Sequence, residues 1–172
     1  MILFLSRAGR RLCLAFLAWA CVPGLVLAEG NCTDRPECWP EGSAMRTGLE
    51  MLAQKRTAEA NLRTRHAELV EFVASSSAEG FKVDERMVAA LRAQQEAWLK
   101  YVAEECELVG ALRGAGGSWG STYATRCELN QTQQRLRRVQ AALRCVRNLP
   151  AADRVMEQGK CLQPLVPLAN AR

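Results

Sequence analysis

The chain has 172 residues, of which 24% are charged and 49% are hydrophobic, and its formal net charge is +5. Residues 1–28 carry three arginines and no acidic residue, so the remainder holds 20 basic and 18 acidic residues, a net charge of +2. So small an excess gives no reason to expect nucleic acid or an anionic membrane as a partner.

Residues 1–28 have the features of a secretory signal peptide. Three arginines precede an uncharged apolar run over residues 12–28, which ends in a small-residue cleavage site. This run is short for a transmembrane helix, which needs about 20 apolar residues. A lipid anchor on Cys21 is disfavoured, because the three residues before it form a poor lipoprotein cleavage signal. We therefore expect an exported protein, periplasmic or extracellular, without a membrane span.

The rest of the chain is long enough for one domain with one core. Its pattern divides into a cysteine-containing N-terminal segment (29–43), a helical domain (44–148) and a proline-containing tail (149–172). The tail has no clear helical period, and we expect it to be irregular.

Three long helical patterns fill the helical domain. The first two cover about residues 44–74 and 84–113, each with apolar residues roughly on one stripe. The third has the cleanest three-and-four spacing, and the capping-box pair Thr125 and Glu128 marks its expected start. Sustained strand alternation is absent. The sequence thus predicts an all-α fold, an antiparallel three-helix bundle with disulfides and irregular N- and C-terminal segments.

Six cysteines remain after the signal peptide, and an even number in an exported chain indicates a disulfide framework. Cys127 and Cys145 lie on one predicted helix, about 27 Å apart, too far for a disulfide. Cys127 instead lies beside the end of the preceding helix, and the tail lies beside Cys145. The predicted pairs are Cys106–Cys127, Cys145–Cys161 and Cys32–Cys38. Cross-pairing of the two N-terminal cysteines with the others stays open as the alternative.

A glycine-rich stretch separates Cys106 from Cys127. A dinucleotide fingerprint is excluded, because Trp119 stands where the third glycine belongs and a helix precedes the stretch. No lysine follows for a phosphate-binding loop. We expect the glycines to end the second helix and to supply positive φ angles in a compact loop over residues 114–126.

No catalytic constellation emerges. His66 is the sole histidine, and oxidised cysteines leave no nucleophile for it to activate. It is expected to be a solvated or packing residue. The acidic cluster on the second helix and the arginines of the third, Arg135 among them, are interpreted as solvated faces. No spacing suits zinc. We therefore expect a non-enzymatic protein without a cofactor or metal.

Two stretches, ALRAQQEAWLKYVAEECELV and GGSWGSTYATRCELNQTQQRLRRVQ, resemble the LprI-type lysozyme inhibitor family over roughly residues 90–139. The family pattern is a Gln–Trp–Tyr–Cys series, a Gly-Gly-Ser loop, a second Cys and a Thr-x-x-Arg. Val102 stands where the family commonly has an arginine. The matching residues are Gln95 (or Gln94), Trp98, Tyr101, Cys106, Gly116, Gly117, Ser118, Cys127, Thr132 and Arg135. Of these, Trp98 and Tyr101 are expected to pack in the core.

The resemblance implies an all-helical, disulfide-bonded exported module that binds a protein, and it suggests inhibition of lysozyme. A lysozyme cleft holds two carboxylates beside the scissile bond. A loop held by a disulfide loses little entropy on docking into such a cleft. The groups available in or beside the 114–126 loop are Arg113, Ser118, Trp119, Tyr123 and Arg126. One alternative is that Trp119 folds back and the loop merely connects two helices. The other is a structural or protein-interaction module of the cell envelope without inhibitory activity.

Overall fold

The computed structural model describes residues 32–78, 81–114 and 117–166, so the expected signal peptide lies outside the described residues. Four α-helices dominate: α1 (Ala44–Ala74), α2 (Glu85–Gly114), α3 (Trp119–Asn148) and α4 (Arg154–Leu162). Three short 3-10 turns accompany them: η1 (Cys32–Asp34), η2 (Pro36–Cys38) and η3 (Gln163–Leu165). The prediction of an all-helical fold is confirmed.

One small exception to the helical fold lies between α1 and α2. Here β1 (Ser77–Ala78) pairs antiparallel with β2 (Phe81–Lys82), with Ser77 opposite Lys82. Two residues in each strand are too few to leave an alternating pattern in the sequence, which is why this pairing was not predicted.

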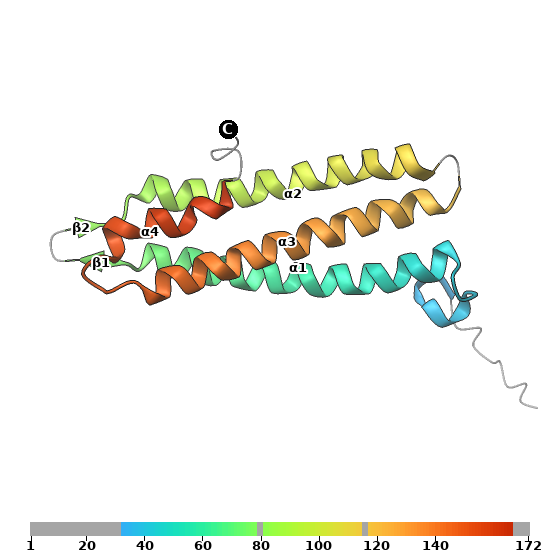
Figure 1. Ribbon diagram of the computed structural model, residues 1–172, viewed down its shortest axis with the longest axis horizontal. Coiled ribbons are helices and arrows are strands. Elements are labelled where there is room, and N and C mark those ends of the chain that lie inside the picture. The colour runs from blue at the N-terminus through green and yellow to red at the C-terminus, as the bar shows by residue number, and fades with distance from the viewer. Residues whose placement is uncertain (1–31, 79–80, 115–116, 167–172) are drawn as a thin grey trace, which may run out of the picture. The chain divides into compact units, whose positions relative to one another are not determined.

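Helix α3 packs along both α1 and α2, which contact each other much less (Figure 1). At its start, Thr122 Oγ1 donates a hydrogen bond to the carbonyl of Ala44, the first residue of α1, at 2.9 Å. Near its end, Arg147 is 3.2 Å from Glu68, late in α1. These two helices therefore run in the same direction. Helix α2 runs opposite to both, because its last turns face the first turns of α3.

The hydrophobic core lies where the end of α1, the start of α2 and the end of α3 meet. It includes the fully buried Leu69, Val73, Val139 and Val146. Residues of α1 and α3 recur at helical spacing, so each helix buries one face. Burying a side chain of this size contributes up to about 1.5–3 kcal/mol.

Helix α4 corrects the expectation of an irregular C-terminal tail. Its residues Gln158 and Cys161, followed by Leu165 in η3, are buried against α3 and the core. The three- and four-residue steps between them place all three on one helical face, which gives this segment a reason to be helical. Pro164 lies in the first turn of η3, where its missing N–H leaves no partner unsatisfied.

The start of α3 corrects a second expectation. The helix begins at Trp119, ahead of Thr125, so the predicted capping box lies inside it. Thr125 donates its hydroxyl to the carbonyl of Ser121 at 2.9 Å, and Glu128 forms an ion pair with Lys55 of α1. The predicted 114–126 loop is therefore mostly helix, and only a short connection follows Gly114.

Three disulfides join the predicted pairs, Cys32–Cys38, Cys106–Cys127 and Cys145–Cys161, so the alternative of cross-pairing by the N-terminal cysteines does not hold. The first closes the N-terminal turns, where Trp39 Nε1 also donates to the carbonyl of Cys32 at 3.1 Å. The second joins α2 to α3, and the third joins α3 to α4. From α2 onward, each helix is thus joined by a disulfide to the helix that follows it.

Candidate functional site at the α2–α3 bend

The α2–α3 bend comprises the last turn of α2 and the first turns of α3, residues 109–114 and 117–131 of the described chain. Three glycines let its helices approach closely. A Cβ on Gly110 would lie 2.7 Å from the carbonyl oxygen of Gly120, and one on Gly114 would overlap the Cα of Gly120. Of the described glycines, only Gly42, with φ of 74°, has a positive φ. The expected positive φ at Gly114 and Gly117 is therefore wrong: Gly114 serves close backbone approach.

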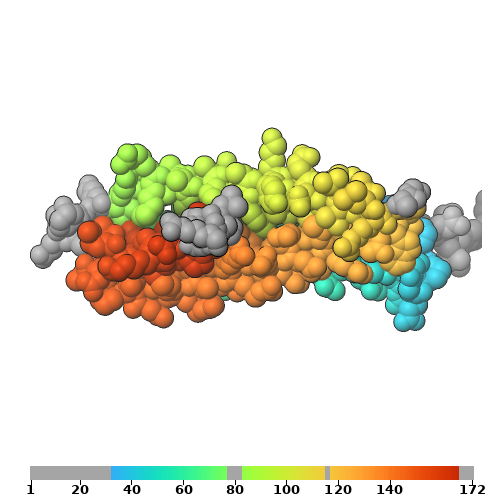
Figure 2. All heavy atoms as spheres, turned by 45° about the horizontal axis from the view of Figure 1, so that its top comes forward, coloured from blue at the N-terminus to red at the C-terminus, as the bar shows by residue number. Residues whose placement is uncertain are grey.

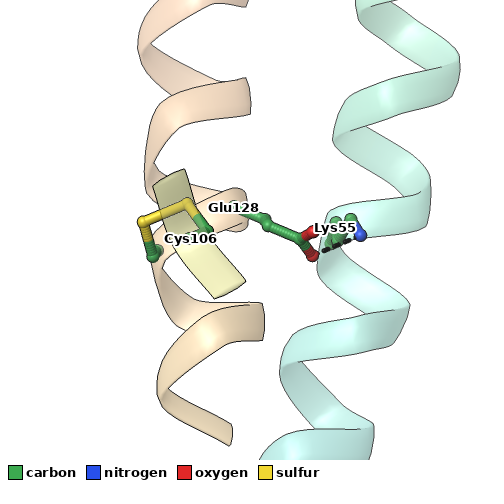
Figure 3. The surroundings of a disulfide bond; sticks show 4 residues. Lys55, Cys106 and Glu128 are labelled. Atoms are coloured by element: carbon green, nitrogen blue, oxygen red, sulfur yellow. Dashed lines mark hydrogen bonds and ion pairs between the residues drawn. A yellow bond between two sulfur atoms is a disulfide. The ribbon is translucent and has the colours of Figure 1, made fainter. Parts of the chain in front are cut away.

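Two consecutive residues of α3 fasten the bend to its neighbours. Cys127 is disulfide-bonded to Cys106 of α2, which is fully buried, with Cα atoms 5.4 Å apart. Glu128 points the other way, and its carboxylate pairs with Lys55 of α1 (Figure 3). The start of α3 is held on both sides, so the bend presents its outer side chains from a rigid base.

A recess of about 230 Å³ lies between α2 and α3 beside this disulfide. Three of the five residues predicted to bind a partner line it: Arg113 from α2, and Tyr123 and Arg126 from α3. The remaining lining residues are Val109, Cys127, Asn130 and Gln131. In the space-filling view the end of α2 and the start of α3 meet along one seam (Figure 2).

Trp119, Tyr123 and Arg126 follow one another on α3 at spacings of four and three, so they share a face. The rings of Trp119 and Tyr123 have centroids 6.0 Å apart, and the Arg126 guanidinium carbon is 5.9 Å from the Tyr123 centroid. Trp119 keeps 41% of its surface exposed, so it does not fold back into the core. This places an aromatic pair next to a cation at the surface.

The two arginines of the recess have no acidic partner of their own. Neither Arg113 nor Arg126 forms an ion pair within the described ranges, and both side chains are exposed. Their guanidinium groups are therefore available to carboxylates of another molecule. Ser118 is exposed beside them but outside the recess, and Gly116 lies outside the described residues. Among the described side chains, no group of His, Cys, Asp and Glu could hold a metal ion.

Most residues of the family pattern are internal instead. Arg135 is 2% exposed, and its guanidinium donates to Gln95 Oε1 at 3.0 Å, to the Leu165 carbonyl at 2.9 Å and to Gln94 Oε1. Gln94 also donates to the same carbonyl at 3.2 Å. Both candidate glutamines of the pattern thus bind the arginine, and the network ties α2, α3 and η3 together.

The interpretation of Arg135 as part of a solvated face is therefore wrong. Burial, aided by the nearby Arg138, lowers the pKa of Arg135 to about 10, so it stays protonated at neutral pH. Its guanidinium carbon is 5.5 Å from the ring centroid of Trp98, which packs against the core. No carboxylate in the described part of the chain pairs with it. Neutral acceptors and an aromatic face hold this buried charge.

Two other residues of the family pattern, Thr132 and Tyr101, differ in their exposure to solvent. Thr132 is buried one turn before Arg135. Tyr101, which was expected in the core, is 62% exposed. The reason lies in helix geometry: Tyr101 is three residues from Trp98, but Trp98 already lies at the edge of the buried face, so one more step turns the side chain outward.

The fold and the bend together define a small all-helical protein that is stapled by disulfides and exposes arginine and aromatic side chains at one helix junction. Residues 38–138, more than half of the chain, match the family described as Lysozyme inhibitor LprI, and the chain belongs to this family. The match extends the resemblance at residues 90–139 back through α1. Comparison with curated proteins and with solved structures finds no match.

Proposed function

We propose that this protein is exported and inhibits a lysozyme-like glycosidase by docking the α2–α3 bend into the enzyme's cleft. Family membership carries the proposal, and the unpaired Arg113 and Arg126 at a rigid recess support it. Removal of residues 1–28 belongs to the proposal. Three disulfides favour an oxidising compartment. Within the described ranges, no helix is long and apolar enough to cross a membrane.

The chemistry of the target supports arginine as the inhibiting group. Glycosidases of this type hold two carboxylates beside the bond they cleave. A guanidinium offers paired donors that match a carboxylate, so Arg126 or Arg113 would bind and neutralise a catalytic acid. Tyr123 and Trp119 would add apolar contact area at the rim. With a mature net charge of +2, long-range attraction to a basic lysozyme is not expected, and short-range contacts must supply the affinity.

We also propose that α1, α2 and α3 form one antiparallel bundle, in which each helix runs opposite to the one before it in sequence.

A rigid bend is the second requirement for inhibition. The Cys106–Cys127 disulfide and the close glycine contacts would hold the bend in its binding conformation before the enzyme arrives. Preorganised groups lose less entropy on binding, which raises affinity without new contacts.

The test is an inhibition titration of several lysozymes with the mature, oxidised protein. We expect Arg126→Ala and Arg113→Ala each to raise the inhibition constant about tenfold or more, as for central interface residues. Arg137→Ala is the matched control, because Arg137 is an exposed arginine of α3 away from the recess. Circular dichroism verifies the fold of each variant. The proposal fails if no lysozyme is inhibited at large excess, or if both recess variants inhibit like the wild type.

A second function is favoured by a different surface. Tyr101, Leu108 and Leu112 are exposed on α2, Leu112 by 75%, and their spacing of seven and four residues places them on one stripe. Exposed apolar stripes of this kind serve protein contacts. The protein would then be a cell-envelope interaction module without inhibitory activity.

Co-purification from envelope extract separates the two functions. If the stripe is the functional surface, Leu108→Glu together with Leu112→Glu would remove envelope partners, and neither the wild type nor this variant would inhibit a lysozyme. Ala111→Glu is the matched control, because Ala111 is exposed on α2 beside the stripe. Loss of the same partners with the control variant would show that added charge alone, and not the stripe, is responsible.

A further inference from the structure

A continuous groove runs between α1 and α2 on the side that α3 does not fill. Two neighbouring hollows of about 640 and 600 Å³ share Ala74, Ser75 and Arg92, and the second shares His66 and Ala67 with a third of about 380 Å³. The groove extends along α1 from Glu59 to the C-cap residue Ser75, about 24 Å at the rise of an α-helix. It lies apart from the recess at the α2–α3 bend and has no role in the proposed inhibition.

His66 lies in the floor of this α1–α2 groove. It is 8% exposed, and its Nε2 has no hydrogen-bond partner within the described residues. Burial is the largest effect on the pKa of His66 and lowers it, and Arg135 and Arg92 lower it further, against a contribution from the Leu91 backbone. A buried polar atom without a partner is unfavourable, so a ligand atom that binds Nε2 would relieve a defect of the free protein.

Two unpaired cations flank His66. Arg63 of α1 lines the smallest hollow and Arg92 of α2 lines the other two, and both side chains are exposed. Neither forms an ion pair within the described ranges. Three acidic residues also line the groove: Glu59, whose carboxylate is 3.6 Å from Lys55, at one end, Glu71 in the middle hollow, and Glu85 at the other end. Beside His66 the groove therefore offers two cations without an ionic partner, with Glu71 more than one helical turn further along α1.

Apolar side chains form part of the wall of each hollow. Val70, Val83 and Val88 line the two larger hollows, and Leu62 and Leu99 line the third. Because both long walls are helices, their backbone N–H and C=O groups are already hydrogen-bonded within each helix. An extended peptide in this groove would leave its own backbone groups unpaired, whereas a hydrocarbon chain has none to satisfy.

We propose that the α1–α2 groove binds a carboxylate-bearing amphiphile of the long-chain fatty-acid class. The carboxylate lies between Arg63 and Arg92 beside His66, and its negative charge favours the protonated imidazole, whose Nε2–H then donates a hydrogen bond to it. The hydrocarbon chain follows Val70, Val88 and Val83. Charge complementarity selects an acid, because the cations lack partners in the free protein. The helical walls select a chain without backbone amides.

The test is a fluorescence titration of the mature, oxidised protein with a fluorescent long-chain fatty acid and with the alcohol of the same chain. We expect saturable binding of the acid and about tenfold weaker binding of the alcohol, because the alcohol lacks the charge-assisted contacts. Arg92→Gln and Arg63→Gln should each weaken the acid about tenfold and leave the alcohol unchanged. Arg56→Gln, an exposed arginine of α1 outside the groove, should bind like the wild type.

A second pair of variants tests the place of the hydrocarbon. Ala67 is exposed and lines two of the hollows, so Ala67→Trp should fill the groove and abolish binding of both ligands. Ala60→Trp, at another exposed alanine of α1, is the matched control. Equal affinity for acid and alcohol, or wild-type binding by Ala67→Trp, would overturn the proposal. Binding of the acid that does not saturate would also overturn it. If Ala67→Trp changed only self-association or lysozyme inhibition, the groove would be a protein-binding surface, and the proposal would fail.

Discussion

Arg126 and Arg135 lie on the same helix, yet they occupy opposite kinds of environment. Arg126 stands at the bend with its guanidinium over Tyr123 and no ionic partner within the described ranges. Arg135 is sealed between α2, α3 and η3 by two glutamines and a backbone carbonyl. The difference shows that in this chain the arginine of the family pattern holds structural elements together, while an arginine outside that pattern is available to a partner.

The comparison predicts opposite effects for two matched substitutions. A change at Arg135 should lower stability and spare the binding surface, and a change at Arg126 should do the reverse. Four sets of substitutions test the expected changes in stability, from the largest to the smallest.

Arg135→Ala should have the largest effect. It leaves a cavity and strips hydrogen bonds from the Leu165 carbonyl and two glutamines, so the free energy of unfolding should fall by about 4 kcal/mol. Urea unfolding measures this change. Below the unfolding transition the variant should still inhibit any lysozyme that the wild type inhibits. Arg137→Ala should change stability by less than about 0.5 kcal/mol, and an equal loss in both variants would contradict the contrast.

Removing the Cys106–Cys127 disulfide with the double substitution Cys106→Ser and Cys127→Ser should come next. The bridge closes a segment of 21 residues, and chain-entropy arguments give about 3 kcal/mol for a loop of this length. Thermal unfolding under oxidising conditions measures the loss. If the bend must be rigid to bind, inhibition should weaken in the folded variant as well. Unchanged inhibition would show that the glycine contacts suffice.

Gly114→Ala should have a smaller effect, a loss of about 2 kcal/mol, because the added methyl group meets the backbone of Gly120, which has little room to move. Gly117→Ala is the matched control in the same connection. Its Cβ would lie 3.8 Å from the nearest atom, an ordinary contact. A comparison of urea midpoints distinguishes the two positions, and equal midpoints would remove the case for close approach at Gly114.

The smallest effect concerns pH and His66. Burial lowers the pKa of His66 in the folded state, so the unfolded chain takes up its proton first as the pH falls. Stability should therefore be complete above the unfolded pKa of about 6.5 and decrease as the pH falls through it, levelling off below the folded pKa. Urea unfolding between about pH 7 and pH 5 measures this slope. His66→Leu should flatten it, and an unchanged slope would assign it to carboxylates.

The sequence predicted the elements better than their ends. Helix length excluded Cys127–Cys145 and favoured Cys106–Cys127 and Cys145–Cys161, whereas Cys32–Cys38 was the pair that remained, with cross-pairing left open until the structure showed it. The start of α3 was misplaced, because Thr125 and Glu128 have the spacing of a capping box although the helix is already formed there. The structure places the five predicted site residues at the bend, and their role in binding stays a prediction; that Trp119, Tyr123 and Arg126 share a helix face follows from the early start of α3, which the sequence analysis missed.

The burial of Arg135 had a signal that was overlooked. It lies three residues after Thr132 and four before Val139, both of which are buried, so it continues the inward stripe of α3. Its neighbours Arg137 and Arg138 belong to other faces. Residue type alone suggested solvent for all three, and position on the helix separates them. The sequence could not predict that the Leu165 carbonyl accepts a hydrogen bond from Arg135, because η3 comes from a segment without a strong periodic pattern.

The hydrogen bond from Arg135 to the carbonyl of Leu165 has a practical consequence for the limits of the domain. The family match ends at residue 138, yet the charge in its final stretch is solvated by a carbonyl from well beyond that boundary. A recombinant protein that ends with α3 would contain the whole matched region and still leave the buried Arg135 guanidinium without the Leu165 carbonyl. We therefore expect shortened versions to need the residues through Leu165 for full stability.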